Sequence, residues 1–519
     1  MFSKVYSAQP TLLGANMVSV EVDVSRGLHS FNVVGLPDKA VEEARDRVSA
    51  AIKNTGFKPP KSKNEKIIIS LAPADLKKEG PLFDVPIALA YLQSSGDIDF
   101  IPDKKIFLGE LSLDGSIRSV RGVLPIAREI KQKGFTEIFV PKENADEATL
   151  IDGLIVYGVG NLKELIEHLT FREATGGAEN QSKKKKLLPA AKSEGGEKTR
   201  GDMLDLCDIR GQESAKRGLE IAAGGGHNIA FYGPPGTGKT MLARAFAGIL
   251  PELDRDSALE VTSIHSVAGL LRENIMREAP FRAPHHTASY VSIIGGGATP
   301  KPGEVTLAHR GVLFLDEFPE FDKRVLESLR QPLEDKMVHV SRAKGTAIFP
   351  ANFILVAAMN PCPCGNNNVK GKRCSCSPGD IARYKRKLSG PIMDRIDLWL
   401  EVGHIDYEKL SEKASGEGSR EASLRVKSAR ETQAKRFAQN KNKIKTNSDV
   451  GVRLLEKLIP ITDDIRKLLN ESARKLDLSP RAYHKTIKVA RTIADLDGSD
   501  SIGTKHLLEA LRYRPRDII

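Results

Sequence analysis

Residues 233–240 form a loop whose composition suits the binding of a polyphosphate. They read Gly-Pro-Pro-Gly-Thr-Gly-Lys-Thr and fit the pattern G-x-x-x-x-G-K-[ST]. An apolar run at 228–232 precedes the loop and a segment of helical character, 241–250, follows it, so the loop lies at the strand-to-helix junction that the motif requires. The glycines let backbone N–H groups face a phosphate, and the helix N-terminus adds positive potential. The predicted ATP-binding residues are Gly233, Pro234, Pro235, Gly236, Thr237, Gly238, Lys239 and Thr240.

Four side chains supply the predicted catalytic lysine, magnesium ligands and base. Lys239 is predicted to contact the β- and γ-phosphates, and the Thr240 hydroxyl to bind Mg²⁺. Further along, the apolar run 312–315 ends at Asp316 and Glu317, the pattern of a buried parallel strand that carries acids at its carboxyl end. Asp316 is predicted to hold Mg²⁺ through a water, and Glu317 to orient or deprotonate the attacking water. Two adjacent acids are weak evidence alone, and the phosphate loop makes the prediction specific.

A further polar residue, Asn360, follows the apolar run 352–359. A side chain at the end of a central strand, level with the acids, can hold the attacking water, so Asn360 is predicted to be catalytic. The alternative is a plain turn before Pro361.

Arg395 stands among small and apolar residues in the segment 389–397, whereas most arginines of the chain lie in charge-rich runs. Phosphoryl transfer gains greatly from an arginine at the γ-phosphate, often supplied by another subunit. Arg395 is therefore a predicted catalytic residue. The alternative is a structural ion pair with Asp397.

Four cysteines cluster between Asn360 and Arg395. The C-x-C spacing is tighter than the usual C-x₂-C of zinc sites, but four thiolates can bind Zn²⁺ tetrahedrally and would rigidify this loop. The alternative is a set of free or redox-active thiols. The candidate zinc ligands are Cys362, Cys364, Cys374 and Cys376.

The composition limits the class of protein. A chain of 519 residues with 40% hydrophobic and 28% charged residues is typical of a soluble protein of about three domains. The net charge of +12 permits a polyanionic partner without requiring one. We found neither an apolar stretch of membrane-spanning length nor a basic-then-apolar leader, so the sequence predicts a cytoplasmic protein without membrane contact.

Composition shifts divide the chain into four parts. Residues 1–171 alternate strand-like and helix-like segments and have no phosphate loop, which predicts an α+β domain. Residues 172–204 lack apolar periodicity and predict a flexible linker, whose four lysines at 183–186 are either solvated or a DNA contact. Residues 205–403 carry the ATPase motifs, and 404–519 predict a helical lid.

Several motifs together resemble the magnesium-chelatase-like AAA+ ATPases, and most closely their ComM/YifB group. The resemblance covers essentially the whole chain, and its motifs are dense. It implies a ring, with six subunits expected, that binds ATP between neighbours and uses Arg395 in trans. It also implies a DNA branch-migration helicase that acts in recombination during natural transformation. The motifs lie at 281–286, 295–297, 302–309, 360–365 and 390–397.

The same resemblance assigns further residues. Arg481, at the start of a lid helix, matches the arginine that contacts the nucleotide in this family, and a solvent-facing arginine is the alternative. The segment 336–350 is predicted to be a hairpin, and such hairpins point into the ring pore, so Arg342 and Lys344 are candidate DNA contacts. The alternative is that they are solvated turn residues. The two histidines at 285–286 are predicted to have a structural or interface role.

The N-terminal domain resembles the proteolytic domain of Lon proteases, which has the ribosomal S5 domain 2-like fold, in the stretches 78–88 and 108–118. The catalytic serine of Lon falls at Leu82 and its lysine near Leu124. Acyl transfer needs a nucleophile and a nearby base, so we expect no peptidase activity. The expected role is a scaffold or a docking site for a protein partner.

These observations predict an α/β AAA+ domain with a helical lid behind a Lon-like domain. The predicted activity is Mg²⁺-dependent ATP hydrolysis that moves on or remodels DNA. The alternative is a chelatase-like remodeller of a protein partner, with the N-terminal domain as adaptor.

Overall fold

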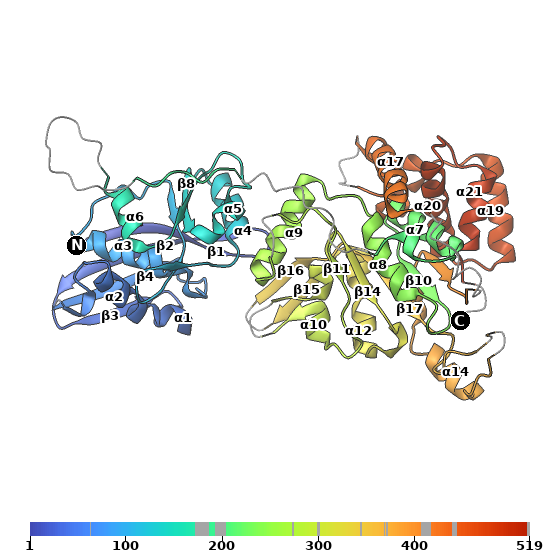
Figure 1. Cartoon of the computed structure of the whole chain (residues 1–519), viewed down its shortest axis with the longest axis horizontal. Helices are drawn as coiled ribbons and strands as arrows, with labels where there is room; N and C mark the ends of the chain where they lie inside the picture. Colours follow the sequence, from blue (N-terminus) through green and yellow to red (C-terminus); the bar gives the residue numbers. More distant parts are fainter. Residues whose placement is uncertain are drawn as a thin grey trace. The chain divides into compact units, whose positions relative to one another are not determined.

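The computed structural model shows two compact units, Met1–Glu197 with Ala258–Met276, and Lys198–Ser257 with Arg277–Ile519 (Figure 1). Every helix in the part of the chain that the structure describes is too short or too polar to cross a membrane. The described residues are 1–62, 64–171, 186–192, 204–271, 275–297, 301–342, 345–367, 369, 372–405, 417–438 and 444–515.

The first unit begins with a four-stranded sheet in the order β1-β2-β4-β3. Alternate residues of β2 (Val18, Val20 and Val22) are fully buried, which is the period-two pattern of a strand with one face on the core. Helix α3 packs on β1 and β2 with nearly every side chain buried. The bounds are β1 (Phe2–Pro10), β2 (Ala15–Arg26), β3 (Ser30–Val34), α1 (Lys39–Glu42), α2 (Ala44–Asn54), β4 (Glu65–Ala72) and α3 (Asp84–Ser94).

A second, parallel sheet of three strands completes this unit. The sequence predicts one strand over 106–112, but two short strands replace it because the backbone of Gly109 exchanges hydrogen bonds with Leu82 and Val85, which belong to no strand. Gly109 also lies close to neighbouring side chains. A Cβ there would lie 2.6 Å from Ile117 and 2.8 Å from Val85. The bounds are β5 (Lys105–Phe107), β6 (Glu110–Leu111), β7 (Ile117–Arg118), α4 (Val123–Gln132), β8 (Glu137–Pro141), α5 (Ala145–Ala148), β9 (Ile155–Val159) and α6 (Leu162–Leu169).

Part of the predicted linker is bound to the first unit. The Ala190 N–H donates to the Val156 carbonyl at 2.8 Å, and the Leu187 N–H donates to Nδ1 of His168 at 3.1 Å. Residues 186–192 therefore run along the domain, where we expected a flexible tether. The remainder of the segment, 172–185 and 193–203, lies outside the described residues.

Helix α9 (Arg255–Ala268) begins in the second unit and ends in the first. Ser266 accepts from the Gly122 N–H at 3.0 Å and donates to Oε1 of Glu147 at 2.5 Å. Glu147 also accepts from the Leu124 N–H at 2.9 Å, and burial raises the pKa of its carboxyl. The sequence did not indicate that this stretch of the ATPase region packs with the N-terminal unit.

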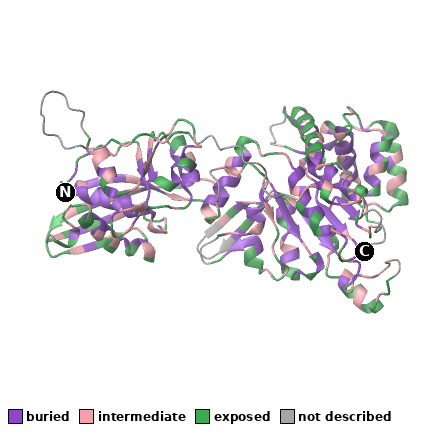
Figure 2. Ribbon diagram, viewed as in Figure 1, coloured by how far each residue is buried: buried purple, intermediate pink, exposed green. Residues whose placement is uncertain are grey.

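The second unit is built on a five-stranded parallel sheet in the order β11-β14-β17-β10-β18. Its central strands are buried on both faces, as the purple strands of Figure 2 show, which explains their continuous apolar sequences. The carboxyl ends of parallel strands share one edge, where ligands bind in such folds. The strands are β10 (Ile229–Tyr232), β11 (Phe281–Arg282), β14 (Val312–Leu315), β17 (Ile354–Met359) and β18 (Leu398–Glu401).

Helices accompany the sheet and form the C-terminal part of the same unit. The described residues after 404 are largely helical, as the sequence predicts for this part of the chain. The helices are α7 (Glu213–Gly225), α8 (Lys239–Ile249), α10 (Tyr290–Ile294), α11 (Glu304–Leu307), α12 (Lys323–Ser328), α13 (Arg330–Asp335), α14 (Pro378–Lys385), α15 (Gly390–Met393), α17 (Ser419–Phe437), α18 (Val452–Leu458), α19 (Asp463–Lys475), α20 (Pro480–Leu496) and α21 (Thr504–Arg512).

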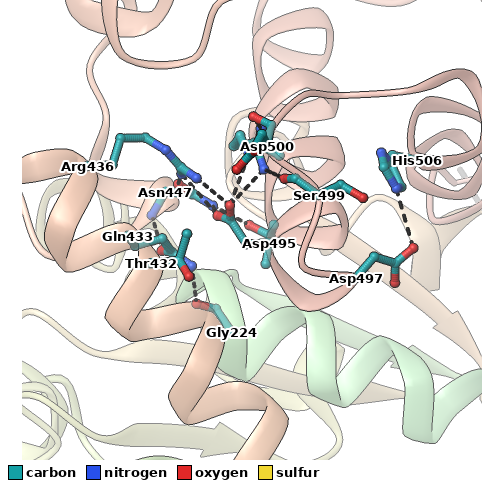
Figure 3. A network of polar contacts seen from close by, with 12 residues as sticks. Gly224, Thr432, Gln433, Arg436, Asn447, Asp495, Asp497, Ser499, Asp500 and His506 are labelled. Carbon is teal, nitrogen blue, oxygen red and sulfur yellow. Dashed lines mark hydrogen bonds and ion pairs between the residues drawn. The ribbon is translucent and has the colours of Figure 1, made fainter.

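A buried polar network links α17 and α20 to α7 (Figure 3). The Asp495 carboxylate, inaccessible to solvent, pairs with Arg436 and Arg491 and accepts from Nδ2 of Asn447 at 2.8 Å. Gln433 donates to the carbonyl of Gly224, in the last turn of α7, at 2.9 Å. Breaking a buried pair of this kind costs about 3–5 kcal/mol. Helix α20, which carries Arg481 in its first turn, is thus anchored through α17 to α7, the helix that precedes β10.

Candidate nucleotide site

The predicted phosphate loop lies between β10 and α8. Gly236 and Gly238 have φ values of +78° and +90°, the left-handed region that glycine enters at little cost. The Thr237 hydroxyl donates to the Pro234 carbonyl at 2.9 Å and closes the turn. Helix α8 begins at Lys239, so its free N–H groups point into the loop.

Lys239 is the centre of the site. Its Nζ donates to the carbonyls of Gly233 at 2.8 Å and Pro234 at 2.7 Å, and to Oδ1 of Asn360 at 3.1 Å. Burial lowers the pKa of this ammonium to about 8, although nearby Asp316 favours the charged form. The residue at the end of β17 therefore contacts the loop lysine, and Asn360 lies where the sequence predicted it.

The predicted magnesium ligands lie side by side. The Thr240 hydroxyl donates to Oδ2 of Asp316 at 2.8 Å, and Oδ1 of Asp316 accepts from the Glu317 N–H at 2.9 Å. A hydroxyl and a carboxylate at a solvent-accessible position form the oxygen-only donor set that Mg²⁺ prefers. The residues present thus fit a magnesium ion held together with a bound nucleotide.

Glu317 has a partner that the sequence did not reveal. Nδ1 of His286 lies 3.0 Å from its Oε2, and Glu317 has a φ of +51°, unusual for a residue with a side chain. His286 follows β11, and β11 pairs with β14, which ends beside Glu317. The pairing of β11 with β14 brings His286 to Glu317. The spacing of these two residues along the chain therefore could not predict their contact.

Arg395 and Arg481 lie together, both on the carboxylate of Glu334. Nη2 of Arg395 is 2.5 Å and Nη2 of Arg481 is 3.1 Å from Oε1 of Glu334. The Arg395 side chain is 11% exposed and that of Arg481 is 56% exposed. The sequence predicted roles for both arginines at a nucleotide, but it did not predict that they share a partner.

Asp397 has other partners than Arg395. It pairs with Lys485 of α20 at 2.9 Å and with His227 at 3.6 Å, and it accepts from the Asn228 N–H at 3.0 Å. Burial alone would raise its pKa, but Lys485 and His227 hold the pKa of Asp397 well below its usual value. The described contacts therefore do not support the alternative in which Arg395 serves a structural pair with Asp397.

The four cysteines converge at the start of the loop after Asn360. Their sulfur atoms all lie within 4.8 Å of one another. Measured separations are 3.4 Å for Cys362–Cys364, 3.6 Å for Cys364–Cys374 and 3.8 Å for Cys362–Cys374. A tetrahedral zinc with bonds of about 2.3 Å separates its thiolates by about 3.8 Å. The cluster can therefore hold a metal ion.

This cysteine loop also packs against the phosphate loop. Gly365 has a φ of +80°, and a Cβ built on it would lie 2.5 Å from Cδ of Pro235. Backbone N–H groups of Asn366 and Ser375 lower the pKa of the Cys364 thiol to about 5. The shape of the cysteine loop is therefore coupled sterically to the loop that would bind phosphate.

The predicted hairpin is confirmed as β15 (Met337–Arg342) and β16 (Gly345–Pro350). Arg342 pairs with Gly345 at the end of the ladder. Lys344, the second candidate DNA contact, lies outside the described residues.

Comparisons with known proteins show the family to which the chain belongs. Three family profiles fit the chain: subunit ChlI of magnesium chelatase at residues 20–144, magnesium chelatase subunit ChlI at 205–410, and the ChlI C-terminal region at 416–514. Competence protein ComM of Haemophilus influenzae is 43% identical, over 98% of this chain and 97% of its own. The chain belongs to the magnesium-chelatase-like AAA+ family, in its ComM/YifB group.

Other members of this family are related to different degrees. YifB of Escherichia coli is 42% identical, over 97% of this chain and 96% of its own. The magnesium-chelatase 67 kDa subunit of Heliobacterium mobile is 28% identical over only 38% of this chain and 34% of its own. Full-length similarity therefore distinguishes the ComM/YifB group from the chelatase subunit.

Proposed function

We propose that the chain is a Mg²⁺-dependent ATPase that works as a ring of six subunits and translocates on or remodels DNA. The finer proposal is a branch-migration helicase that acts in the cytoplasm, in recombination during natural transformation. One observation carries the ATPase proposal: at one edge of a parallel sheet, Lys239 donates a hydrogen bond to Asn360 and Thr240 donates one to Asp316. The name of the Haemophilus relative, a competence protein, supports the pathway.

In this proposal each side chain has one role. The Lys239 ammonium exchanges its present acceptors, two carbonyl oxygens and the Asn360 amide oxygen, for the β- and γ-phosphates. Thr240 and Asp316 would hold the magnesium ion, which would neutralise phosphate charge. Glu317 removes the proton from the attacking water and Asn360 orients that water. Arg395 completes the site of the neighbouring subunit, and Arg481 contacts the nucleotide.

DNA is proposed as the substrate on two grounds, the hairpin of β15 and β16 and the similarity to ComM. Arg342 and Lys344, the residues that the sequence predicts for this role, are proposed to contact phosphates. Contacts to phosphates give affinity but no sequence information. The partial similarity to a magnesium-chelatase subunit favours the second candidate, an ATP-dependent remodeller of a protein partner.

The test is the ATPase rate with single-stranded, duplex and four-way DNA at low salt. We expect four-way DNA to stimulate the rate most, and Lys239→Ala to abolish it with every substrate. The double variant Arg342→Ala, Lys344→Ala should keep the basal rate and lose the stimulation. If DNA neither binds nor stimulates a protein that hydrolyses ATP, the DNA proposal fails and the protein-remodeller candidate takes its place.

The N-terminal unit is proposed to be a Lon-like scaffold without peptidase activity, available to a protein partner. The residues at the two positions that matter, Leu82 and Leu124, are both buried apolar side chains. They offer neither a nucleophile nor a base. Degradation of casein in the presence of ATP would overturn this proposal.

The four-cysteine cluster is proposed to hold a structural Zn²⁺. Its support is the convergence of the four sulfur atoms within 4.8 Å at separations suited to tetrahedral thiolate ligation. The ion would hold the cysteine loop in the shape that packs on Pro235.

A further inference from the structure

Two arginines from distant segments meet on one oxygen atom. Arg395 follows α15, and Arg481 lies in the first turn of α20. Both reach Oε1 of Glu334, near the end of α13, at 2.5 Å and 3.1 Å. Two like charges placed this close repel each other, so the Glu334 carboxylate offsets a repulsion that would otherwise separate them.

The two guanidinium groups therefore form a binding site for an anionic oxygen, and Glu334 is its present occupant. Arginine donors match carboxylate and phosphate oxygens equally well, because both present negatively charged oxygens at similar spacing. The Glu334 side chain is 47% exposed, so solvent and an incoming anion can reach it.

Arg395 is turned toward its own subunit. Its Nη1 donates to the Pro391 carbonyl, and Nη2 pairs with Glu334. With only 11% of its side chain exposed, Arg395 cannot reach a phosphate on another molecule without leaving the carboxylate.

The segment that carries Arg395 is also tied to α20 at a second point. Nζ of Lys485 donates to the Ile396 carbonyl at 3.2 Å and pairs with Asp397 at 2.9 Å. Helix α20 is thus linked to this segment twice. Lys485 contacts the segment directly, and Arg481 is linked to it through Glu334. The two arginines are held as a pair, and Glu334 is the group between them.

We propose that Glu334 is an internal competitor for phosphate. In a subunit whose neighbour holds no ATP, its carboxylate keeps Arg395 and Arg481 together; the γ-phosphate of ATP on the neighbouring subunit then takes its place. Glu334 is a positioning residue, because it acts through the arginines and does not touch the nucleotide. This inference rests on the proposed role of Arg395 in trans.

A competitor of this kind lowers the apparent affinity for ATP, because only the fraction of subunits with released arginines is competent. Glu334→Gln keeps the shape of the side chain and removes its charge. We expect a half-saturating ATP concentration about three- to tenfold lower, with the maximal rate within about twofold. The affinity for ADP, which lacks the γ-phosphate, should not change. Asp335→Asn, which changes the adjacent exposed carboxylate, is the matched control and should behave as wild type.

Two further variants make the test specific. Glu334→Asp should restore wild-type behaviour in part, because it returns the charge. In the background Arg395→Ala, Arg481→Ala, the change Glu334→Gln should have no further effect on ATP affinity. An effect that persists without the arginines would contradict the proposal, as would a lower maximal rate with a higher half-saturating concentration.

ATP-dependent assembly, followed by sedimentation, tests the same equilibrium without turnover. The Glu334→Gln variant should assemble at a lower ATP concentration than wild type, and unchanged assembly would overturn the proposal. The proposed ATPase function fails separately, if wild type does not hydrolyse ATP or if Lys239→Ala leaves hydrolysis intact.

Discussion

The two parts of the candidate site are built in different ways. The first is the P-loop cluster, in which Lys239 and Thr240 at the start of α8 donate hydrogen bonds to Asn360 and Asp316 at the ends of two strands of one sheet. The second, the arginine pair of Arg395 and Arg481, comes from helix ends and is bridged by one half-exposed carboxylate.

The P-loop cluster is therefore preformed, whereas the arginine pair must change its contacts before it can act. The P-loop cluster lies at the ends of buried strands and in the first turn of α8, so we expect its geometry to change little on binding. The arginine pair has to exchange its carboxylate for another anion before Arg395 can act. Hydrolysis in the proposed ring therefore depends on the part that is less firmly held.

Arg395→Ala gives the largest expected effect, because it removes the part supplied by a neighbour. An arginine at the transferred phosphate is worth about 10³- to 10⁵-fold in rate, so hydrolysis should fall by that factor while ATP still binds. Steady-state ATPase and equilibrium nucleotide binding measure the two quantities. Mixing Arg395→Ala with Lys239→Ala subunits should restore part of the activity, since some interfaces then combine an intact loop with an intact arginine. The absence of any restoration would place Arg395 in its own subunit's site.

Glu317→Gln tests the chemistry of the P-loop cluster itself. A positioned general base contributes about 10²- to 10⁴-fold, so the variant should bind ATP normally and hydrolyse it slower by that factor. Single-turnover measurements with radiolabelled ATP give the rate. Asp322→Asn, an exposed helix-capping acid close by, is a control for a general loss of charge. Normal turnover of Glu317→Gln would assign the base to another group.

The pKa of Lys239 provides a prediction of moderate size. Burial lowers it to about 8 in the free protein, so the ammonium loses its proton as the pH rises above that value. A bound phosphate favours the charged form, and binding must then take up a proton. ATP affinity should be nearly constant below pH 7 and fall about tenfold between pH 7 and 9, because one proton is linked to binding. Calorimetry in two buffers of different ionisation enthalpy measures this uptake, and Lys239→Arg should show no such fall. A flat profile for wild type would mean that the lysine stays charged throughout.

Loss of the metal proposed for the cysteine cluster has the smallest expected effect on rate. Thiol titration should release about one zinc ion per chain, in line with a tetrathiolate site. Cys362→Ser should lower the melting temperature by a few degrees and the ATPase rate by a few-fold, because Gly365 would no longer be held against Pro235. Metal analysis and thermal unfolding are the measurements. The control is Cys207→Ser, which changes the cysteine outside the cluster. A metal-free wild type with full activity would reject the proposal.

Local patterns predicted the P-loop cluster well. The loop, the apolar strands and the polar residues that follow them are adjacent in the chain, so Asp316 and Asn360 are placed to the residue. The contacts of the arginine pair depend on which helix ends meet, so the sequence did not indicate Glu334 as their shared partner. The contact of His286 with Glu317 depends on the pairing of two strands that are separate in the sequence. The breaks at Gly109 and the docking of residues 186–192 were missed for a similar reason, since both depend on neighbours from elsewhere in the fold.

Helix α9 has a consequence for any attempt to separate the ATPase from the N-terminal unit. Its buried side chains, with the Ser266 hydroxyl between Gly122 and Glu147, complete the folded N-terminal unit, although they come from the middle of the ATPase sequence. No single cut can therefore divide the chain into two finished domains. A protein that begins at residue 204 would expose the apolar side chains of residues 258–276, because the N-terminal unit that buries them would be missing. A protein that ends at residue 204 would lack this part of the core of the N-terminal unit.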